Sequence, residues 1–549
     1  IPSALQNPKH RIFPQNLYDA VEAYHQAIDC DKDPRCLSVI WDCTHCVLLL
    51  VAQATREGTL TAEDADILSE NLFNSLAVYY PVTFNPPPND VNPISKDDLI
   101  RSLQTVMCSH TNTAKFVCPM LMEHWRSGNS NVKGEVLRTW TYFCGAGVGL
   151  RSSESSATSS SSFKQFAEAI LKELQTASDQ QLKATALETV RSVAKVVATY
   201  SEAQGSSEWR LFSTPFMTYC LEVFGGDDPN NNDNNSNSSS TGDSTSGLTP
   251  QQQALANLTK NNRTGSSGEE GVDNAQGHLA CDLLWALGGS SWFAFASVMA
   301  SSFTAILRRA QVTRSGSSDG GAEGVGVAVA PVRLLARLLS SVVNFQVQLH
   351  DVDHHPLQPY QAELWALFIG IAQKFLLNST VAAPSRSEVA RFQIALRGLP
   401  TWLNPKIRHL LQPHTTPSTA TTTSNKDEDR TRVDASAQVV AILATIITNP
   451  TAFNRHSKGI ADEAVELTAQ VVAYANDDDC TNIQDQIVGP LLSQLFDSLK
   501  KGKEAEEEAG EPEWPLKVLQ RLGALPRYFP HIASQLITRS VSVNVTAET

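Results

Sequence analysis

The length and charge of this chain exclude several classes of protein. At 549 residues it is too long for one compact core, because single cores stop growing at roughly 250 to 300 residues. We therefore expect several domains or an elongated array of repeats. Lysine and arginine number 43 against 57 aspartates and glutamates, for a net charge of -14. A surface of this sign does not attract a polyanion, so direct binding to nucleic acid is not expected.

The cysteines and the first residues of the chain indicate the compartment. Ten cysteines occur without the dense, even spacing of a small secreted scaffold, which predicts reduced thiols in a cytosolic or nuclear protein. The chain opens with Ile1 rather than methionine, and no basic segment followed by an apolar core is visible there. We therefore expect a fragment or a processed chain without a visible signal peptide.

Helical periodicity dominates the N-terminal half of the chain. The sequence "SKDD" (Ser95 to Asp98) is typical of a capping box, in which a hydroxyl and a carboxylate three residues apart each bond the other residue's amide. Apolar residues three to four apart then predict a helix from Leu99 to Met107 and a return helix from Phe116 to Trp125. Two more stripes, over Phe163 to Leu174 and Leu182 to Val197, predict a second antiparallel pair.

The same pattern continues toward the C-terminus without a strict consensus. No convincing alternating strands separate the helices, so a sheet is not expected. Stacked hairpins of irregular length predict an all-α fold, an irregular HEAT-type helical-repeat superhelix (α-solenoid) in which each hairpin buries its apolar stripe against its neighbours. Further hairpins are expected at Val332 to Leu349 with Ala362 to Leu377, Val439 to Thr448 with Ala461 to Tyr474, and Ile487 to Leu499 with Pro515 to Leu522.

Polar segments divide this array. Disordered insertions are predicted at 225–275, which contains "PNNNDNNSNSSSTG", and at the threonine-rich 413–432, with a glycine-rich flexible loop at 311–330. The helical parts expected between them are N-terminal repeats over 1–150, a hairpin region over 163–224, repeats over 276–412, and truncated repeats over 433–549.

One charge-free stretch could be either a membrane-spanning helix or a pair of buried helices. Leu283 to Leu307 is long enough to cross a bilayer. However, Gly288 and Gly289 favour a break between two helices, and serines are tolerated in packed helices when their hydroxyls bond backbone carbonyls. We therefore expect buried helices here and no membrane partner.

A cluster of cysteines near the N-terminus is compatible with two interpretations. "CTHC" (Cys43 to Cys46), with Cys30 and Cys36 upstream, has enough thiols for a zinc or iron-sulfur site. The spacing instead favours one face of a helix that begins with Asp33 as N-cap and Pro34 in its first turn. We expect reduced, metal-free thiols that behave as small apolar side chains, on a stripe formed by Cys36, Ile40, Cys43 and Val47.

A histidine-rich turn is the other candidate for chemistry. "HDVDHH" (His350 to His355) offers imidazoles and carboxylates to a hydrolytic metal ion, so a metal-dependent hydrolase using His350 and Asp351 is one alternative. Such a turn is also expected after an apolar helix and before Pro356, because cations suit a helix C-terminus. No second set of ligands is visible. We therefore assign no catalytic residue, metal or cofactor, and we do not expect an enzyme.

The stretch "VYYPVTFNPPPND" (Val78 to Asp90) interrupts the helices. Prolines prevent a helix from continuing, and three in a row favour an extended polyproline conformation with unpaired carbonyls. The aromatic side chains are large enough to anchor it against neighbouring helices. Both a loop that only keeps register and a partner-facing ridge are compatible with these features. The candidate partner-binding residues are Tyr80, Pro81, Phe84, Pro86, Pro87, Pro88, Asn89 and Asp90.

Three stretches near the N-terminus resemble one known family. They are "DKDPRCL" (Asp31 to Leu37), "ENLFNSLAVYYPVTFNPPPND" (Glu70 to Asp90) and "ISKDDLIRSL" (Ile94 to Leu103). Together they resemble the N-terminal domain of the methyl-methanesulfonate-sensitivity nineteen family, and the aromatic and proline string is the most specific part. The resemblance covers about Ile28 to Trp125. Members of this family are HEAT-repeat adaptors of the cytosolic iron-sulfur assembly targeting complex.

The resemblance implies a function, whereas the helical periodicity of the apolar residues indicates only the fold. It implies a non-catalytic adaptor, in the cytoplasm and nucleus, that brings the assembly machinery to apo-proteins of DNA repair, replication and transcription, such as helicases and polymerases. Family members dock a WD-repeat propeller and a small carrier protein through later repeats. Because this chain stops at Thr549, we expect that docking region to be missing or incomplete. Another HEAT-repeat scaffold, such as a nuclear transport receptor, is the alternative.

Deletion of the segment from Gly225 to Ala275 should leave the midpoint of thermal unfolding nearly unchanged. Its composition offers almost no apolar area to offset the entropy of ordering it. Circular dichroism at 222 nm of the deletion variant and the parent chain provides the check. A large loss of helical signal would show that the segment is packed.

Overall fold

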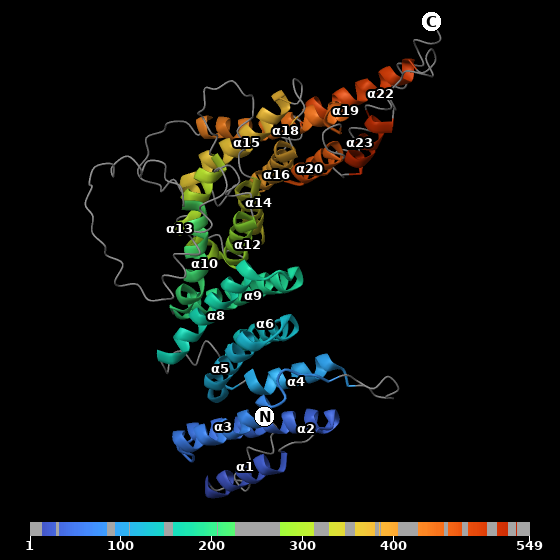
Figure 1. The fold of residues 1–549 in the computed structure, drawn as a ribbon. Coiled ribbons are helices and arrows are strands. Elements are labelled where there is room, and N and C mark those ends of the chain that lie inside the picture. The colour runs from blue at the N-terminus through green and yellow to red at the C-terminus, as the bar shows by residue number, and fades with distance from the viewer. Residues whose placement is uncertain are drawn as a thin grey trace, which may run out of the picture. The chain divides into compact units, whose positions relative to one another are not determined.

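The computed structural model describes the helical parts of the chain. The described residues are 14–28, 32–84, 94–108, 110–147, 157–205, 207–225, 275–311, 329–345, 357–378, 384, 386–404, 426–454, 459–474, 481, 483–501, 513–524 and 534. Every regular element among them is a helix, which confirms the predicted all-α fold (Figure 1). The chain divides into two compact units, Ile1–Glu222 with Asp282–Val298 and Val223–Cys281 with Met299–Thr549.

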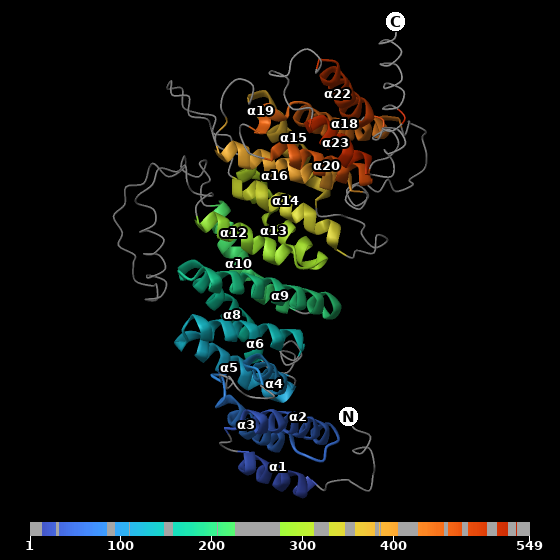
Figure 2. The ribbon, with the colours of Figure 1, turned by 90° about the vertical axis from the view of Figure 1, so that its right-hand side faces the viewer.

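The first unit is built from two layers of helices. One layer contains α1 (Pro14–Ile28), α3 (Ala62–Ala77), α5 (Thr111–Ser127) and α8 (Ala157–Thr176). The other contains α2 (Pro34–Arg56), α4 (Lys96–Cys108), α6 (Ser130–Gly145) and α9 (Gln180–Gln204). Each helix contacts its neighbours within its layer and a partner in the other layer, and the helices stack in chain order (Figure 2). This is the predicted HEAT-type arrangement, in which a hairpin buries its apolar stripe against the next hairpin.

The second unit repeats this principle with less regular pairs. It contains α14 (Val329–Asn344), η5 (Gln358–Tyr360), α15 (Gln361–Asn378), α16 (Arg386–Leu403), α18 (Lys426–Thr448), α19 (Pro450–Asn454), α20 (Ile460–Tyr474), η6 (Gln484–Val488), α22 (Gly489–Lys501) and α23 (Glu513–Gly523). The predicted hairpins α18 with α20 and α22 with α23 are confirmed. However, α14 packs mainly on α16, a helix that the periodicity did not indicate.

A glycine explains how closely α15 and α16 approach. A Cβ atom added at Gly398 of α16 would lie 2.7 Å from Cε1 of Phe368 in α15. Phe368 is fully buried and has little room to move away. The contact between these two helices therefore depends on the missing side chain at this position.

Two predicted N-caps are confirmed. The Asp33 carboxylate accepts a hydrogen bond from the Arg35 amide at 2.8 Å, and Pro34 occupies the first turn of α2. At α4, the Ser95 hydroxyl accepts from the Asp98 amide at 3.1 Å, and the Asp98 carboxylate accepts from the Ser95 amide at 3.4 Å. The hydrogen bonds with Ser95 hold the pKa of the Asp98 carboxyl below its ordinary value.

The buried face of α2 differs from the predicted one. The expected core stripe is wrong, because Cys36 and Cys43 are exposed. The helix is apolar around most of its circumference, so periodicity alone does not choose the buried face. Burying Trp41 and Leu48 removes more apolar area from water than burying two cysteines would. The buried positions of α2 are Leu37, Trp41, Thr44, Leu48, Val51 and Ala54.

The charge-free stretch from Leu283 to Leu307 is divided between two helices. Helix α12 (Ala275–Gly288) ends before α13 (Trp292–Gln311) begins, which confirms the predicted break. At the break, the Ser290 hydroxyl donates to the Leu287 carbonyl at 2.6 Å. Among the described residues, the helix long and apolar enough to cross a membrane is α2 instead. Its core face packs on α3 and α4.

The predicted insertions fall largely outside the described residues. Helix α10 (Glu208–Gly225) ends and α12 begins where the 225–275 insertion was expected to start and finish. The part of the predicted 413–432 insertion from Lys426 onward lies in α18, and its first part, 413–425, lies outside the described residues. The first residues of α18 are lysine, glutamate, aspartate and arginine, and three of these four types favour helix.

Aromatic rings join three helices of the first unit. Trp140 of α6 stacks on Phe166 of α8 with a centroid distance of 3.9 Å, and it meets Phe163 edge to face at 5.7 Å. Trp125 of α5 contacts the same Phe166 ring at 6.1 Å. All four rings are buried, so this cluster ties α5 and α6 to α8.

Substituting Trp140→Ala should lower the free energy of unfolding of the first unit by about 3–5 kcal/mol, because a large buried side chain leaves a cavity. Val78→Ala is the control, since Val78 is 79% exposed and its truncation should change stability by less than about 0.5 kcal/mol. Chemical denaturation followed by tryptophan fluorescence and circular dichroism measures both. Equal effects of the two substitutions would contradict the packing described for Trp140.

Candidate partner-binding segment

The candidate segment begins where α3 ends. The amides of Tyr79 and Tyr80 donate to the carbonyls of Leu76 and Ala77, each at 3.1 Å. The Tyr80–Pro81 peptide bond is cis. The described part of the segment continues to Phe84. The other predicted contacts lie outside the described residues, namely Pro86, Pro87, Pro88, Asn89 and Asp90.

Tyr80 fixes the segment to the helices beside it. Its side chain is only 5% exposed, and its ring meets the His124 ring of α5 edge to face at 5.1 Å. The Tyr80 hydroxyl donates to Oγ1 of Thr139 in α6 at 3.3 Å. Burial raises the pKa of this hydroxyl above its ordinary value. Tyr80 therefore acts as an anchor, as its size predicted.

Thr139 connects the anchor to two helices. Its hydroxyl oxygen also accepts from Nε2 of Gln104 in α4 at 2.9 Å, and its proton goes to the Glu135 carbonyl at 2.9 Å. Thr139 is fully buried, so its hydrogen-bonding capacity is used inside the protein. The segment, α4 and α6 meet at this one hydroxyl.

A buried carboxylate holds the backbone of the segment. The Val82 amide donates to Oε1 of Glu135 at 3.0 Å. Val82 and Glu135 are each 6% exposed. Burial raises the pKa of the Glu135 carboxyl, while the hydrogen bond from Val82 opposes that rise. An extended segment without helical hydrogen bonds is thus fixed by side chains of α6.

The less buried members of the segment are the ones that a partner can reach. Pro81 and Phe84 are half-buried, and Thr83 is exposed. Tyr79 is also half-buried and meets the Trp41 ring edge to face at 5.9 Å. Among the described residues from Tyr79 to Phe84, these are the ones whose side chains another protein can reach.

Glu135 and Thr139 were not indicated by the sequence. They lie more than fifty residues from the segment along the chain, and their neighbours in α6 follow an ordinary helical pattern. One weak signal exists, because Glu135 interrupts the buried face that contains Val136 and Trp140. A buried acid in such a position needs a hydrogen-bond donor.

The candidate metal ligands do not assemble into a site in the described residues. No group of three or more histidine, cysteine or acidic side chains that could hold a metal ion occurs there. Cys36, Cys43 and Cys46 are exposed, whereas Cys30 and the turn from His350 to His355 lie outside the described residues.

Two imidazoles join α2 to the start of α5. Nδ1 of His45 and Nε2 of His110 lie 3.0 Å apart. Burial, together with the neighbouring His45, lowers the pKa of His110 to about 4. His110 is therefore neutral near pH 7 and shares a hydrogen bond with His45, which is a structural role.

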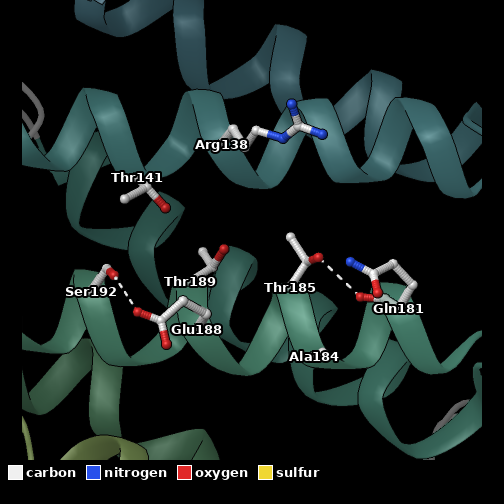
Figure 3. Close-up of a pocket in the computed structure, with 8 residues that line it drawn as sticks. All are labelled: Arg138, Thr141, Gln181, Ala184, Thr185, Glu188, Thr189 and Ser192. Atoms are coloured by element: carbon white, nitrogen blue, oxygen red, sulfur yellow. Dashed lines mark hydrogen bonds between the residues drawn. The ribbon is translucent and has the colours of Figure 1, made fainter.

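A groove between α6 and α9 is lined mainly by hydroxyl, amide and charged side chains (Figure 3). It has a volume of about 460 Å³. The hydroxyls of Thr141 and Thr185 donate to carbonyls of their own helices, at 3.0 and 2.9 Å. No histidine or cysteine lines the groove, so its hydroxyls have no adjacent imidazole or thiol base to activate them. The lining residues are Arg138, Thr141, Gln181, Ala184, Thr185, Glu188, Thr189 and Ser192.

Comparison with known proteins confirms the resemblance over the N-terminal part of the chain. Residues 3–165 match the family MMS19_N, described as Dos2-interacting transcription regulator of RNA-Pol-II. The match includes α1 to α6 and the whole candidate segment.

Curated relatives match over a similar region. The chain is 33% identical over 126 residues to the MMS19 nucleotide excision repair protein homolog of Bos taurus and 32% identical to that of Homo sapiens. It is 31% identical over the same length to the homolog of Dictyostelium discoideum. The matches cover 23% of this chain and 10 to 11% of the relatives. The matched region thus corresponds to about a tenth of those proteins.

A solved structure gives only a distant match. The C-terminal fragment of the Chaetomium thermophilum cohesin loader SCC2 is 10% identical and has a TM-score of 0.18, over 84% of this chain and 39% of that one. This similarity is too low to inform function.

Two substitutions at Glu135 should separate its hydrogen bond from its charge. Glu135→Ala leaves the buried Val82 amide without an acceptor, which should lower the free energy of unfolding by about 1–3 kcal/mol. Glu135→Gln retains an acceptor oxygen and should be neutral or stabilising at pH 7. Chemical denaturation provides the measurement, and a glutamine variant as unstable as the alanine variant would contradict the assigned role.

The pH dependence of the glutamine variant should report the raised pKa of Glu135. A carboxyl whose pKa is higher in the folded state contributes stability below its unfolded pKa of about 4, and this contribution is lost as pH rises through the folded pKa. The stability of Glu135→Gln relative to the parent should therefore increase above pH 4 and then level off. A constant difference from pH 4 to pH 7 would contradict the raised pKa.

Proposed function

We propose that this chain is a non-catalytic adaptor of cytosolic iron-sulfur protein assembly. It delivers the assembly machinery to apo-proteins of DNA repair, replication and transcription, and it works in the cytoplasm and nucleus. The observation that carries this proposal is the match of residues 3–165 to MMS19_N. The relatives' names, which refer to nucleotide excision repair, support the connection to DNA repair.

The structure is compatible with an adaptor in a specific way. Stacked hairpins bury their apolar stripes against one another and leave the outer surface of each layer available for partners. Within the described residues, the segment from Tyr80 to Phe84 is held by buried groups of α6. Such preorganisation lowers the entropic cost of binding.

The proposed partners are of two kinds. One kind comprises the targeting subunits of the assembly machinery, a WD-repeat propeller and a small carrier protein. The other comprises apo iron-sulfur clients such as helicases and polymerases. The chain matches about a tenth of the relatives' length, and both kinds of partner belong to the proposal.

A pull-down with the tagged chain tests the proposal. The probes are an apo iron-sulfur helicase, the propeller with the small carrier protein, and a nuclear transport GTPase in its GTP-bound state. The proposal predicts retention of the apo-helicase and no retention of the GTPase. Retention of the GTPase alone would overturn the proposal in favour of a transport receptor.

Replacement of Pro86, Pro87 and Pro88 by serine should weaken capture of the apo-helicase at least about fivefold, with the midpoint of thermal unfolding nearly unchanged. The triplet favours a preformed extended backbone, and serines would make its ordering costly. Val78→Ser is the matched control, because Val78 is 79% exposed and lies in the same segment. If capture is unaffected, or falls only in step with stability, the triplet serves as scaffolding.

A further inference from the structure

Two exposed cysteines lie one helical turn apart in α2. Cys43 and Cys46 are free, exposed thiols, and their spacing of three residues places them on one face of the helix. The sequence predicted metal-free thiols because it placed Cys36 and Cys43 in the core, and this reason does not hold for exposed thiols. The buried face contains Trp41 and Leu48 instead. A dissolved ion can therefore reach both sulfur atoms.

The helix holds the two Cβ atoms too far apart for a disulfide bond. Residues three apart on an α-helix have Cβ atoms roughly 5–6 Å from each other, whereas a disulfide requires about 3.5–4.5 Å. A shared metal ion spans a longer distance, because it adds two metal–sulfur bonds of about 2.3 Å each between the sulfur atoms. The spacing of Cys43 and Cys46 therefore suits one bridging ion better than a bond between the two sulfurs.

The neighbouring side chains leave this pair with two ligands. In the described part of the chain, no group of three or more histidine, cysteine or acidic side chains is placed to hold a metal ion. The adjacent His45 is bonded through Nδ1 to His110. Cys36 lies seven residues before Cys43, or roughly 10 Å along the helix. Zinc and iron-sulfur clusters take about four protein ligands, whereas monovalent copper is a soft ion that binds thiolates and is satisfied by two.

We propose that Cys43 and Cys46 form a binding site for monovalent copper, in which the two thiolates hold one ion between them. Binding replaces two thiol protons by one copper ion and leaves a bis-thiolate complex with one negative charge. No electron is transferred, because copper enters and stays in the monovalent state. The site does not depend on the proposed adaptor role.

The residues around the pair suit such an ion. Val39, which is 62% exposed, precedes Cys43 by about one turn, and the half-buried Leu50 follows Cys46 by about one turn. These apolar side chains flank the pair along the helix and limit the access of water to a metal held there. The exposed carboxylate of Asp42 adds attraction for an approaching cation.

Competition with a coloured chelator measures the binding. The full chain is titrated without oxygen against the monovalent copper complex of bicinchoninate, and the absorbance that the chelator loses reports the copper transferred. Cys43→Ser and Cys46→Ser should each weaken the site at least about a hundredfold, because the loss of an outer-shell partner alone costs about 10–100-fold in metal affinity.

Cys36→Ser is the matched control. Cys36 is an exposed thiol of the same helix and lies too far from Cys43 to share the ion, so its replacement should leave copper affinity unchanged. Copper should also raise the midpoint of thermal unfolding of the parent chain and of Cys36→Ser, but not of the other two variants. Without copper, all variants should unfold like the parent, since the replaced side chains are exposed.

X-ray absorption at the copper edge, with one copper ion added per chain, identifies the ligands. The proposal predicts two sulfur neighbours in the parent chain and in Cys36→Ser. Three sulfur neighbours would overturn the two-thiolate site. Copper affinity that survives in both Cys43→Ser and Cys46→Ser, or that falls equally in all three variants, would refute the assignment to this pair.

Discussion

The hydrogen bond from the Val82 amide to the buried carboxylate of Glu135, 3.0 Å long, is the contact on which the candidate segment depends. Between α3 and α4 the chain leaves the helical ladder, so its backbone groups need other partners. Glu135 supplies one acceptor, and Thr139 binds the Tyr80 hydroxyl one turn later on the same helix. The position of the segment is therefore set by α6, a helix that follows it in the sequence by some fifty residues.

This arrangement connects the stability of the first unit to the position of the segment. The hairpins of the first unit bury aromatic rings such as Trp140 and Phe166, which makes the layers rigid. A rigid layer can hold an extended segment at its edge in one conformation, and such a segment presents backbone carbonyls and half-buried side chains to another protein. In the groove between α6 and α9, the hydroxyls of Thr141 and Thr185 are bonded to carbonyls of their own helices.

Structure that depends on neighbouring residues was predicted well from the sequence. The wrong predictions concern features that depend on how distant parts of the chain pack. The capping box at Ser95 and the N-cap at Asp33 depend on a few neighbouring residues, and both are present. The buried face of α2 was misassigned because apolar residues occur on more than one face of this helix. The face that contains the large Trp41 side chain is the one that is buried. The contact of Glu135 with Val82 was not predictable, since it joins residues that only the completed fold brings together.

Site-specific photocrosslinking tests the central proposal, that a client protein binds at the anchored segment. A photoreactive amino acid would replace Phe84, which is half-buried at the outer end of the segment, and in a parallel sample Val78, which is 79% exposed at the end of α3. Illumination with an apo iron-sulfur helicase should give a crosslinked product from position 84 and little from position 78. Crosslinks from position 78 alone, or from neither position while the helicase is still captured, would place the client surface elsewhere.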